Sequence, residues 1–192
     1  METETTDTII RATGRCLCEY GYADLTMQRI AEESSLTTAA IHYHFDTKEE
    51  LLNALLDDLV DRFERKLACE SDDPRDQLVV LLDAVFTPSN ADEFPVALME
   101  LKAQAPYHDS YRKRFGELDE TLRTVVEDAV DAGIEAGYFD AVDAAEVARF
   151  VGTAINGGHL RMVALGQDST ETRQVVEKYL ETRLGWKPGA SA

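Results

Sequence analysis

The histidine and cysteine side chains, which most often bind transition metals or act as nucleophiles, are few in this chain. They are four histidines and three cysteines: His42, His44, His108, His159, Cys16, Cys18 and Cys69. A metal site in a helical bundle uses Glu three residues before His, and none of these histidines has that neighbour. His42 and His44 are two residues apart and share no helical face.

The cysteines and the loops add no reactive site. Cys16 and Cys18 are separated by one residue, which is not the usual zinc spacing, and no second pair follows. The chain contains no nucleophile motif and no phosphate-binding loop. We therefore expect a protein that is not an enzyme and that carries no cofactor and no metal.

The first fifty residues indicate short helices that lie close together in the chain. Apolar spacing predicts an amphipathic helix from Thr8 to Tyr20 that ends at Gly21. Thr26 is a good N-cap for the next short helix, and Thr37 caps another that reaches about His44. Two short helices joined by a tight turn are typical of a helix-turn-helix, whose second helix can enter a DNA major groove.

The rest of the chain shows helical periodicity and no sustained two-residue alternation. The expected helices begin at Thr47, Pro74, about Glu93, before Phe115, after Asp143 and at Ser169. We predict an all-α fold of about nine helices. A three-helix helix-turn-helix domain over 1–46 precedes a larger helical domain for ligand binding and dimerisation over 47–192.

The stretch from Gly21 to Leu52 resembles the tetracycline-repressor (TetR) family of transcriptional regulators. The family pattern has a Gly-aromatic pair, threonine caps, paired small residues and an aromatic end to the second short helix. Here the matching residues are Gly21-Tyr22, Thr26, Ile30-Ala31, Ser35-Leu36, Thr37, Ala39-Ala40, Tyr43-His44-Phe45 and Lys48-Glu49-Glu50-Leu51. The chain departs from the pattern at Ser35 and Ala39, where the family has Gly, and at His42, where it has an aromatic residue.

The resemblance implies that the helix from Thr37 to His44 is a recognition helix. The residues it places at base edges are Thr38, Ala39, Ala40 and His42. The residues it places at phosphates are Thr26, Thr37, Tyr43, His44 and Lys48. Small side chains would let the backbone approach the bases, and an Ala or Thr methyl can touch a thymine methyl. We expect Phe45 to pack in the core, which is also the alternative role for Tyr43.

The charge of the chain opposes DNA binding. The net charge is −18, and residues 1–50 contain four basic and ten acidic side chains, a balance of −6. DNA binding ordinarily gains from the release of counterions by basic side chains, which this domain largely lacks. We hypothesise that hydrogen bonds, apolar base contacts and cations held between carboxylates and phosphates replace that gain. The alternative is that the domain no longer binds DNA.

The composition also concerns the solvent and the location of the protein. Arg (13 residues) outnumbers Lys (6) in a strongly acidic chain, which is typical of proteins from salt-accumulating halophiles, an ordinary acidic protein being the alternative. The longest apolar run, from Leu78 to Leu82, is too short to span a bilayer. No signal peptide is apparent, so we expect a cytoplasmic protein without a membrane partner.

Six helices after Thr47 could enclose an apolar cavity for a small molecule. The candidate lining residues are Phe86, Phe94, Met99, Tyr107, Tyr111, Phe115, Asn156 and His159. Core packing is the alternative for each aromatic residue, and a hydrogen-bonded interior position is the alternative for His159. These residue types favour a small apolar or aromatic effector.

The expected function follows from these parts. The resemblance implies a homodimer through the last two helices, bound to a palindromic double-stranded DNA operator. We expect a ligand-responsive repressor that an effector releases from its operator, although a ligand could instead favour the DNA-bound state. The alternative is a ligand-binding or protein-interaction dimer of the same fold that has lost operator binding.

Overall fold

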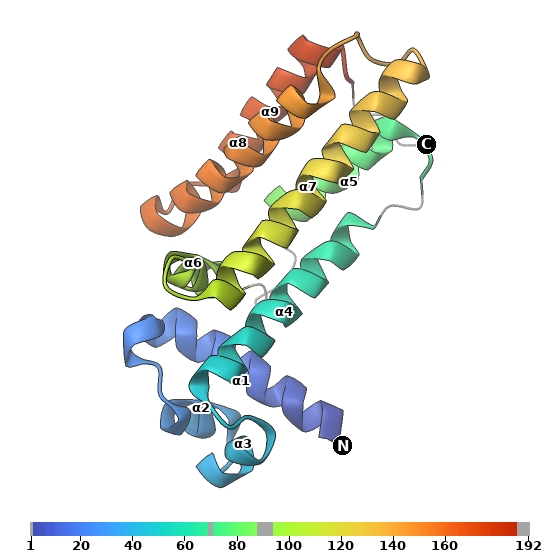
Figure 1. Cartoon of the computed structure of the whole chain (residues 1–192). Coiled ribbons are helices and arrows are strands. Elements are labelled where there is room, and N and C mark those ends of the chain that lie inside the picture. Colours follow the sequence, from blue (N-terminus) through green and yellow to red (C-terminus); the bar gives the residue numbers. More distant parts are fainter. Residues whose placement is uncertain (1, 69–70, 88–93, 188–192) are drawn as a thin grey trace. The chain divides into compact units, whose positions relative to one another are not determined.

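The structure, a computed structural model, describes residues 2–68, 71–87 and 94–187. All regular elements in these ranges are α-helices, which confirms the predicted fold class. Figure 1 shows the helices, which are α1 (Glu2–Asp24), α2 (Met27–Ser34), α3 (Thr38–His44), α4 (Lys48–Leu67), α5 (Pro74–Phe86), α6 (Pro95–Gln104), α7 (Asp109–Glu135), α8 (Ala144–Leu165) and α9 (Ser169–Leu184). Cys69 and Glu93 lie outside the described residues.

The chain forms two compact units, and each is described here by itself. The first contains Met1–Arg62 and Ser89–Gly116, and the second contains Phe63–Pro88 and Glu117–Ala192. Packing therefore groups α6 and the first turns of α7 with the N-terminal helices, while α4 and α7 contribute to both units. These packing units do not test the predicted boundary between a DNA-binding domain and a ligand-binding domain at 46 and 47, which stays a prediction.

The first unit is built on the buried stripes of α1 and α4. Ile9 and Leu17 on α1 and Leu51 and Leu55 on α4 have no exposed surface. The predicted end of the first helix at Gly21 is a kink with φ of 73°, beyond which one more turn reaches Asp24. The helix begins earlier than predicted, at Glu2 rather than Thr8, because nothing in the polar segment before Thr8 breaks a helix.

The helix α6 packs on α1 at a glycine. A Cβ atom at Gly14 would lie 2.5 Å from the ring of Phe94, so the missing side chain admits that ring. Phe94 is 3% exposed and has a positive φ of 44°, directly before Pro95. The helix therefore begins at Pro95 rather than at Glu93, because proline suits the first helical position and Phe94 turns away from helical geometry.

The second unit has an apolar core made by α5, α7, α8 and α9. Its helix ends use the predicted signals: Asp73 accepts from the Arg75 amide, Asp143 accepts from the Glu146 amide, and Gly166 ends α8 with φ of 64°. The last helix begins at Ser169 as predicted, with Asp168 as its N-cap. The Ser169 hydroxyl donates to the Phe86 carbonyl at 3.0 Å, which ties α9 to the end of α5.

The helices α8 and α9 lie side by side and antiparallel in Figure 1. The rings of Phe150 and Tyr179 stack with centroids 3.8 Å apart, and Arg183 pairs with Glu146 at 3.3 Å. After α9, Trp186 is 2% exposed and closes the core. Over the described ranges, the structure contains no helix long and apolar enough to cross a membrane.

Candidate nucleic-acid interface

The turn between α2 and α3 has the geometry of a helix-turn-helix. The Thr26 hydroxyl accepts from the Arg29 amide at 3.3 Å and caps α2. Ser35 ends α2 in the left-handed region with φ of 57°, the conformation that glycine adopts most easily. The Thr37 hydroxyl then accepts from the Ala40 amide at 3.1 Å and begins α3. Ser35 therefore adopts a backbone conformation for which the family uses Gly.

The short helix α3 is held by its apolar residues and leaves the others accessible. Ile41 has no exposed surface, and Phe45, directly after the helix, is 6% exposed, as predicted for a core residue. Tyr43 is 77% exposed in the single chain, so its side chain does not pack in the core of that chain. Ala39 and His42 are also exposed, whereas Thr38, Ala40 and His44 are half-buried. The four predicted base-facing residues and two of the phosphate-facing residues, Tyr43 and His44, therefore share one short, anchored helix, while Thr26, Thr37 and Lys48 lie at the ends of α2, α3 and α4.

The basic side chains of the N-terminal helices are engaged within the protein. Arg15 pairs with Glu33 at 2.5 Å. The Arg29 guanidinium donates to the Asp24 carbonyl at 2.9 Å. The Lys48 ammonium donates to the Tyr22 carbonyl at 2.7 Å, and burial lowers the pKa of Lys48. The candidate interface thus has little cationic surface to offer a phosphate backbone.

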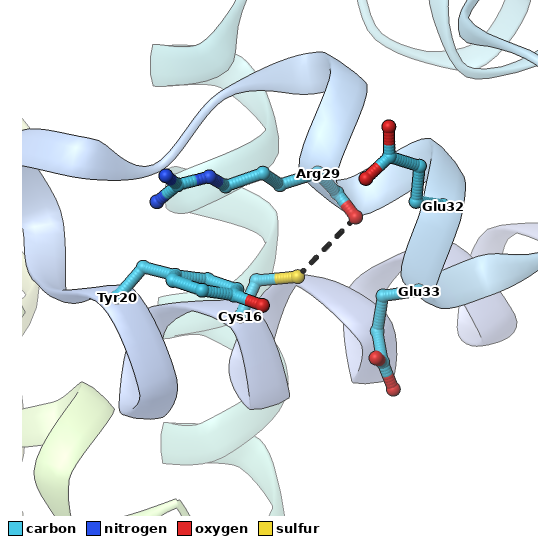
Figure 2. Close-up of a pocket in the computed structure, with 5 residues that line it drawn as sticks. All are labelled: Cys16, Tyr20, Arg29, Glu32 and Glu33. Atoms are coloured by element: carbon cyan, nitrogen blue, oxygen red, sulfur yellow. Dashed lines mark hydrogen bonds between the residues drawn. The ribbon is translucent and has the colours of Figure 1, made fainter.

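A polar hollow of about 220 Å³ lies between α1 and α2. Figure 2 shows Cys16 and Tyr20 on one side and Arg29, Glu32 and Glu33 on the other, with the guanidinium 4.2 Å above the Tyr20 ring. The Cys16 thiol donates to the Arg29 carbonyl at 3.6 Å, and burial raises the pKa of Cys16 to about 11. These contacts join α1 to α2, and the thiol is a poor nucleophile because little of it is thiolate.

Tyr22 makes contacts that the sequence did not predict. Its amide donates to a Glu100 carboxylate oxygen at 3.1 Å, and its hydroxyl lies 3.0 Å from Nε2 of His108. Nδ1 of His108 in turn lies 3.4 Å from a Glu49 carboxylate oxygen. In the sequence, Tyr22 stood out only as the aromatic residue of the Gly-aromatic pair at 21–22. That pair does not predict its partners Glu100 and His108, which are 78 and 86 positions away.

The candidate ligand residues of the first unit lie in different surroundings. Phe94 packs on α1 at Gly14, and Tyr107 is 80% exposed. Tyr111 has no exposed surface, and its hydroxyl has no hydrogen-bond partner among the described residues. Burial raises the pKa of Tyr111 well above its ordinary value. Phe115 is half-buried beneath the Lys102 ammonium, and Met99 is half-buried on α6.

The candidate ligand residues of the second unit are also spread out. Phe86 is 6% exposed and belongs to the core. Asn156 is exposed, and its amide donates to the Gly152 carbonyl at 3.0 Å along α8. His159 is half-buried on the same helix and interacts with another group. In the described ranges, no group of three or more His, Cys, Asp or Glu side chains is arranged to hold a metal ion.

These elements define a helical DNA-binding regulator, with a capped helix-turn-helix followed by a helical domain. Comparison with protein families agrees with that class. Residues 9–55 match the family described as bacterial regulatory proteins, tetR family. Residues 74–185 match the family described as BetI-type transcriptional repressor, C-terminal.

Individual relatives extend the match along the chain. The transcriptional regulator TtgR of Pseudomonas putida is 33% identical over 193 residues, which cover 94% of this chain and 90% of the relative. The regulator BetI of Stenotrophomonas maltophilia is 38% identical over 85 residues, and the match covers 42% of this chain and only 43% of that relative.

Two solved structures show the same architecture. A TetR transcription regulator from Haloarcula marismortui is 40% identical with a TM-score of 0.87, covering 95% of this chain and 99% of that one. A protein from Saccharomonospora viridis in complex with choline is 21% identical with a TM-score of 0.86, covering 95% and 98%. The chain belongs to the TetR family of transcriptional regulators. Members with this organisation regulate transcription and are not enzymes.

Proposed function

We propose that this chain is a ligand-responsive repressor that binds a palindromic operator as a homodimer and leaves it when a small effector binds. The observation that carries the proposal is the state of α3. The helix is capped by Thr37 and anchored by Ile41, while Tyr43 is 77% exposed. A short helix with one buried side and an accessible opposite side suits insertion into a major groove.

The proposed contacts to DNA follow from this placement. Thr38, Ala39, Ala40 and His42 read base edges, and Thr26, Thr37, Tyr43, His44 and Lys48 contact phosphates. Small residues on α3 favour close approach of its backbone to the bases. Two copies related by a two-fold axis would match half-sites about one helical turn apart, or a multiple of that.

Exposed apolar side chains on the last two helices support the dimer. Leu160 and Leu165 on α8 are 52% and 61% exposed, Phe150 is 38% exposed, and Val175 on α9 is 61% exposed. Water contact with such side chains is unfavourable, and a second copy would bury them. Light scattering after size exclusion is expected to give a dimer for the natural chain and for Ala132→Glu, and a monomer for Leu160→Glu. A dimer that persists in Leu160→Glu would contradict this interface.

The buried hydroxyl of Tyr111 supports an effector site on α7. An unpaired buried hydroxyl is costly, and a ligand acceptor would satisfy it. We propose a small, largely apolar effector with one acceptor group for this hydroxyl, and we assign the half-buried Met99 on α6 and Phe115 on α7 to the same site. Choline, a cation rather than an apolar compound, is the first alternative effector to test, because the C-terminal match is BetI-type and one structure of this fold holds choline. Quaternary ammonium groups bind aromatic faces, so an aromatic set could also accept it.

Footprinting on the protein's own promoter in concentrated KCl tests the DNA function. The natural chain is expected to protect a palindromic segment, and Tyr43→Ala to lose that protection. Tyr138→Ala is a matched control, since this tyrosine is 48% exposed and lies outside α3. The absence of protection by the natural, correctly folded chain would instead favour a dimer of this fold that has lost operator binding. The balance of −6 in residues 1–50 is the observation that favours this second candidate.

A further inference from the structure

Tyr22 uses every polar group it has, and each goes to a different helix. Its amide donates to Glu100 on α6 at 3.1 Å, and its hydroxyl meets His108, directly before α7, at 3.0 Å. Its carbonyl accepts from Lys48 on α4 at 2.7 Å, and its ring lies 4.6 Å below the same ammonium. The residue directly follows the kink at Gly21, so it lies in the last turn of α1, just before the connection to α2.

The hydrogen bonds of His108 have a definite direction in the neutral ring. Glu49 offers a carboxylate, which only accepts, so Nδ1 of His108 carries the proton at 3.4 Å. Nε2 is then the acceptor, and the Tyr22 hydroxyl donates to it. The imidazole therefore holds the Tyr22 ring between α7 and the first turn of α4.

The ring contact extends this chain toward Tyr111. The His108 and Tyr111 rings have centroids 4.8 Å apart, and Tyr111 is the buried residue whose hydroxyl has no partner among the described residues. A connected path therefore runs from Tyr111 through His108 and Tyr22 to Lys48. The path ends at a side chain to which the proposed function gives a phosphate contact.

We propose that Tyr22 is a positioning residue that sets the place of the Lys48 ammonium at the DNA backbone in response to α6 and the start of α7. This inference rests on the proposed operator binding. When His108 or Glu100 moves, Tyr22 moves with it, and the carbonyl and ring face that hold Lys48 are displaced. The cation then leaves its phosphate, and operator affinity falls without any change in α3 itself.

The salt dependence of operator binding provides a specific readout. Each cation–phosphate contact contributes about −0.9 to the slope of log affinity against log salt, so a dimer that loses both Lys48 contacts loses about 1.8. Lys48→Gln is expected to flatten the slope by that amount, and Tyr22→Leu, which keeps the main-chain carbonyl but loses the ring and the hydroxyl, to flatten it by less. His108→Gln, which keeps the Tyr22 side chain but removes the imidazole that holds its hydroxyl, is also expected to flatten it in part. Neither Tyr22→Leu nor His108→Gln should change the slope further in a Lys48→Gln background.

The controls separate positioning from loss of fold. Tyr138→Leu removes a half-exposed ring outside the first unit and is expected to leave the slope unchanged. Thermal unfolding of each variant shows whether it folds, and His108→Gln provides the test if Tyr22→Leu does not. Rescue is expected in Tyr22→Phe, which keeps the ring face and loses only the hydroxyl, so its slope should lie nearer the natural value than that of Tyr22→Leu.

Two results would overturn the inference while leaving operator binding intact. One is a natural slope in folded Tyr22→Leu and His108→Gln, and the other is an additional loss when either is combined with Lys48→Gln. If the natural chain fails to protect its promoter, the proposed function fails first and this inference falls with it.

Discussion

The salt response of operator binding is the sharpest consequence of the charges in the first unit. A typical repressor that makes six to ten phosphate contacts loses about 10³- to 10⁵-fold in affinity between 50 and 200 mM salt. Here Arg15 is paired with Glu33, and Arg29 donates to the Asp24 carbonyl. Arg11 also has a partner. Lys48 is also held, by the Tyr22 carbonyl, but it is the one of these four basic side chains to which the proposed function gives a phosphate contact, one per protomer.

The magnitude follows from that count. Two contacts in a dimer give a slope of about −1.8, so a fourfold rise in KCl is expected to weaken binding only about twelvefold. Cations taken up between protein carboxylates and DNA phosphates would make the slope shallower still. Fluorescence anisotropy of a labelled operator from 0.5 to 2 M KCl measures it, with circular dichroism recorded at each point. The low end is set high because a chain of charge −18 repels itself when salt is dilute.

One outcome would refute this reasoning. A slope of about −5 or steeper corresponds to six or more phosphate contacts, so the internal pairs of Arg15 and Arg29 would have to open on binding. A shallow slope that Lys48→Gln leaves unchanged would show that Lys48 contacts no phosphate. In that case the whole affinity would come from hydrogen bonds and apolar base contacts.

Three further predictions concern stability and reactivity. Gly133→Ala is expected to destabilise the fold by about 1–3 kcal/mol in chemical denaturation, because its Cβ would lie 2.0 Å from the Phe139 ring. Gly116→Ala on the same helix has open space and should be neutral or stabilise by up to about 1 kcal/mol, and equal effects would contradict the packing argument. Ser35→Gly should raise the unfolding temperature or leave it unchanged, because Ser35 has a φ of 57°, which glycine adopts without strain. A clearly lower unfolding temperature would count against strain at this turn. In a variant with Cys16 as the sole cysteine, alkylation of the thiol at pH 8 should be slow, because the raised pKa keeps the thiol protonated. The alkylation rate should increase as the pH approaches about 11. Fast labelling of the folded protein at pH 8 would disprove this prediction.

Much of the helical framework could be predicted because its signals are local. Asp73, Asp143, Gly137 and Gly166 lie at helix ends as predicted, since a cap or a left-handed residue acts within a few positions along the chain. Thr47 and Glu50 at the start of α4 have the three-residue spacing of a capping box, but they form only half of one. Thr47 accepts from the Glu50 amide, but the Glu50 carboxylate accepts from the amide of Asp46.

The surroundings of the candidate ligand residues could not be predicted in the same way. Tyr107 and Tyr111 are four residues apart and of the same type, yet one is 80% exposed and the other is fully buried. Periodicity marks both as apolar enough for a core or a cavity, but it does not say which neighbours cover them. Burial is decided by elements that arrive from elsewhere in the chain.

The sequence by itself determined the all-α class, the capped helix-turn-helix and the family, because these depend on residues that are neighbours along the chain. Its charge determined that any DNA contact must work with few cations. Only the tertiary structure decided that Lys48 is held by Tyr22, and that Tyr22 meets His108, which is 86 positions away. Such pairs form when packing of separate helices brings distant groups together, and no local pattern of one sequence encodes the partner.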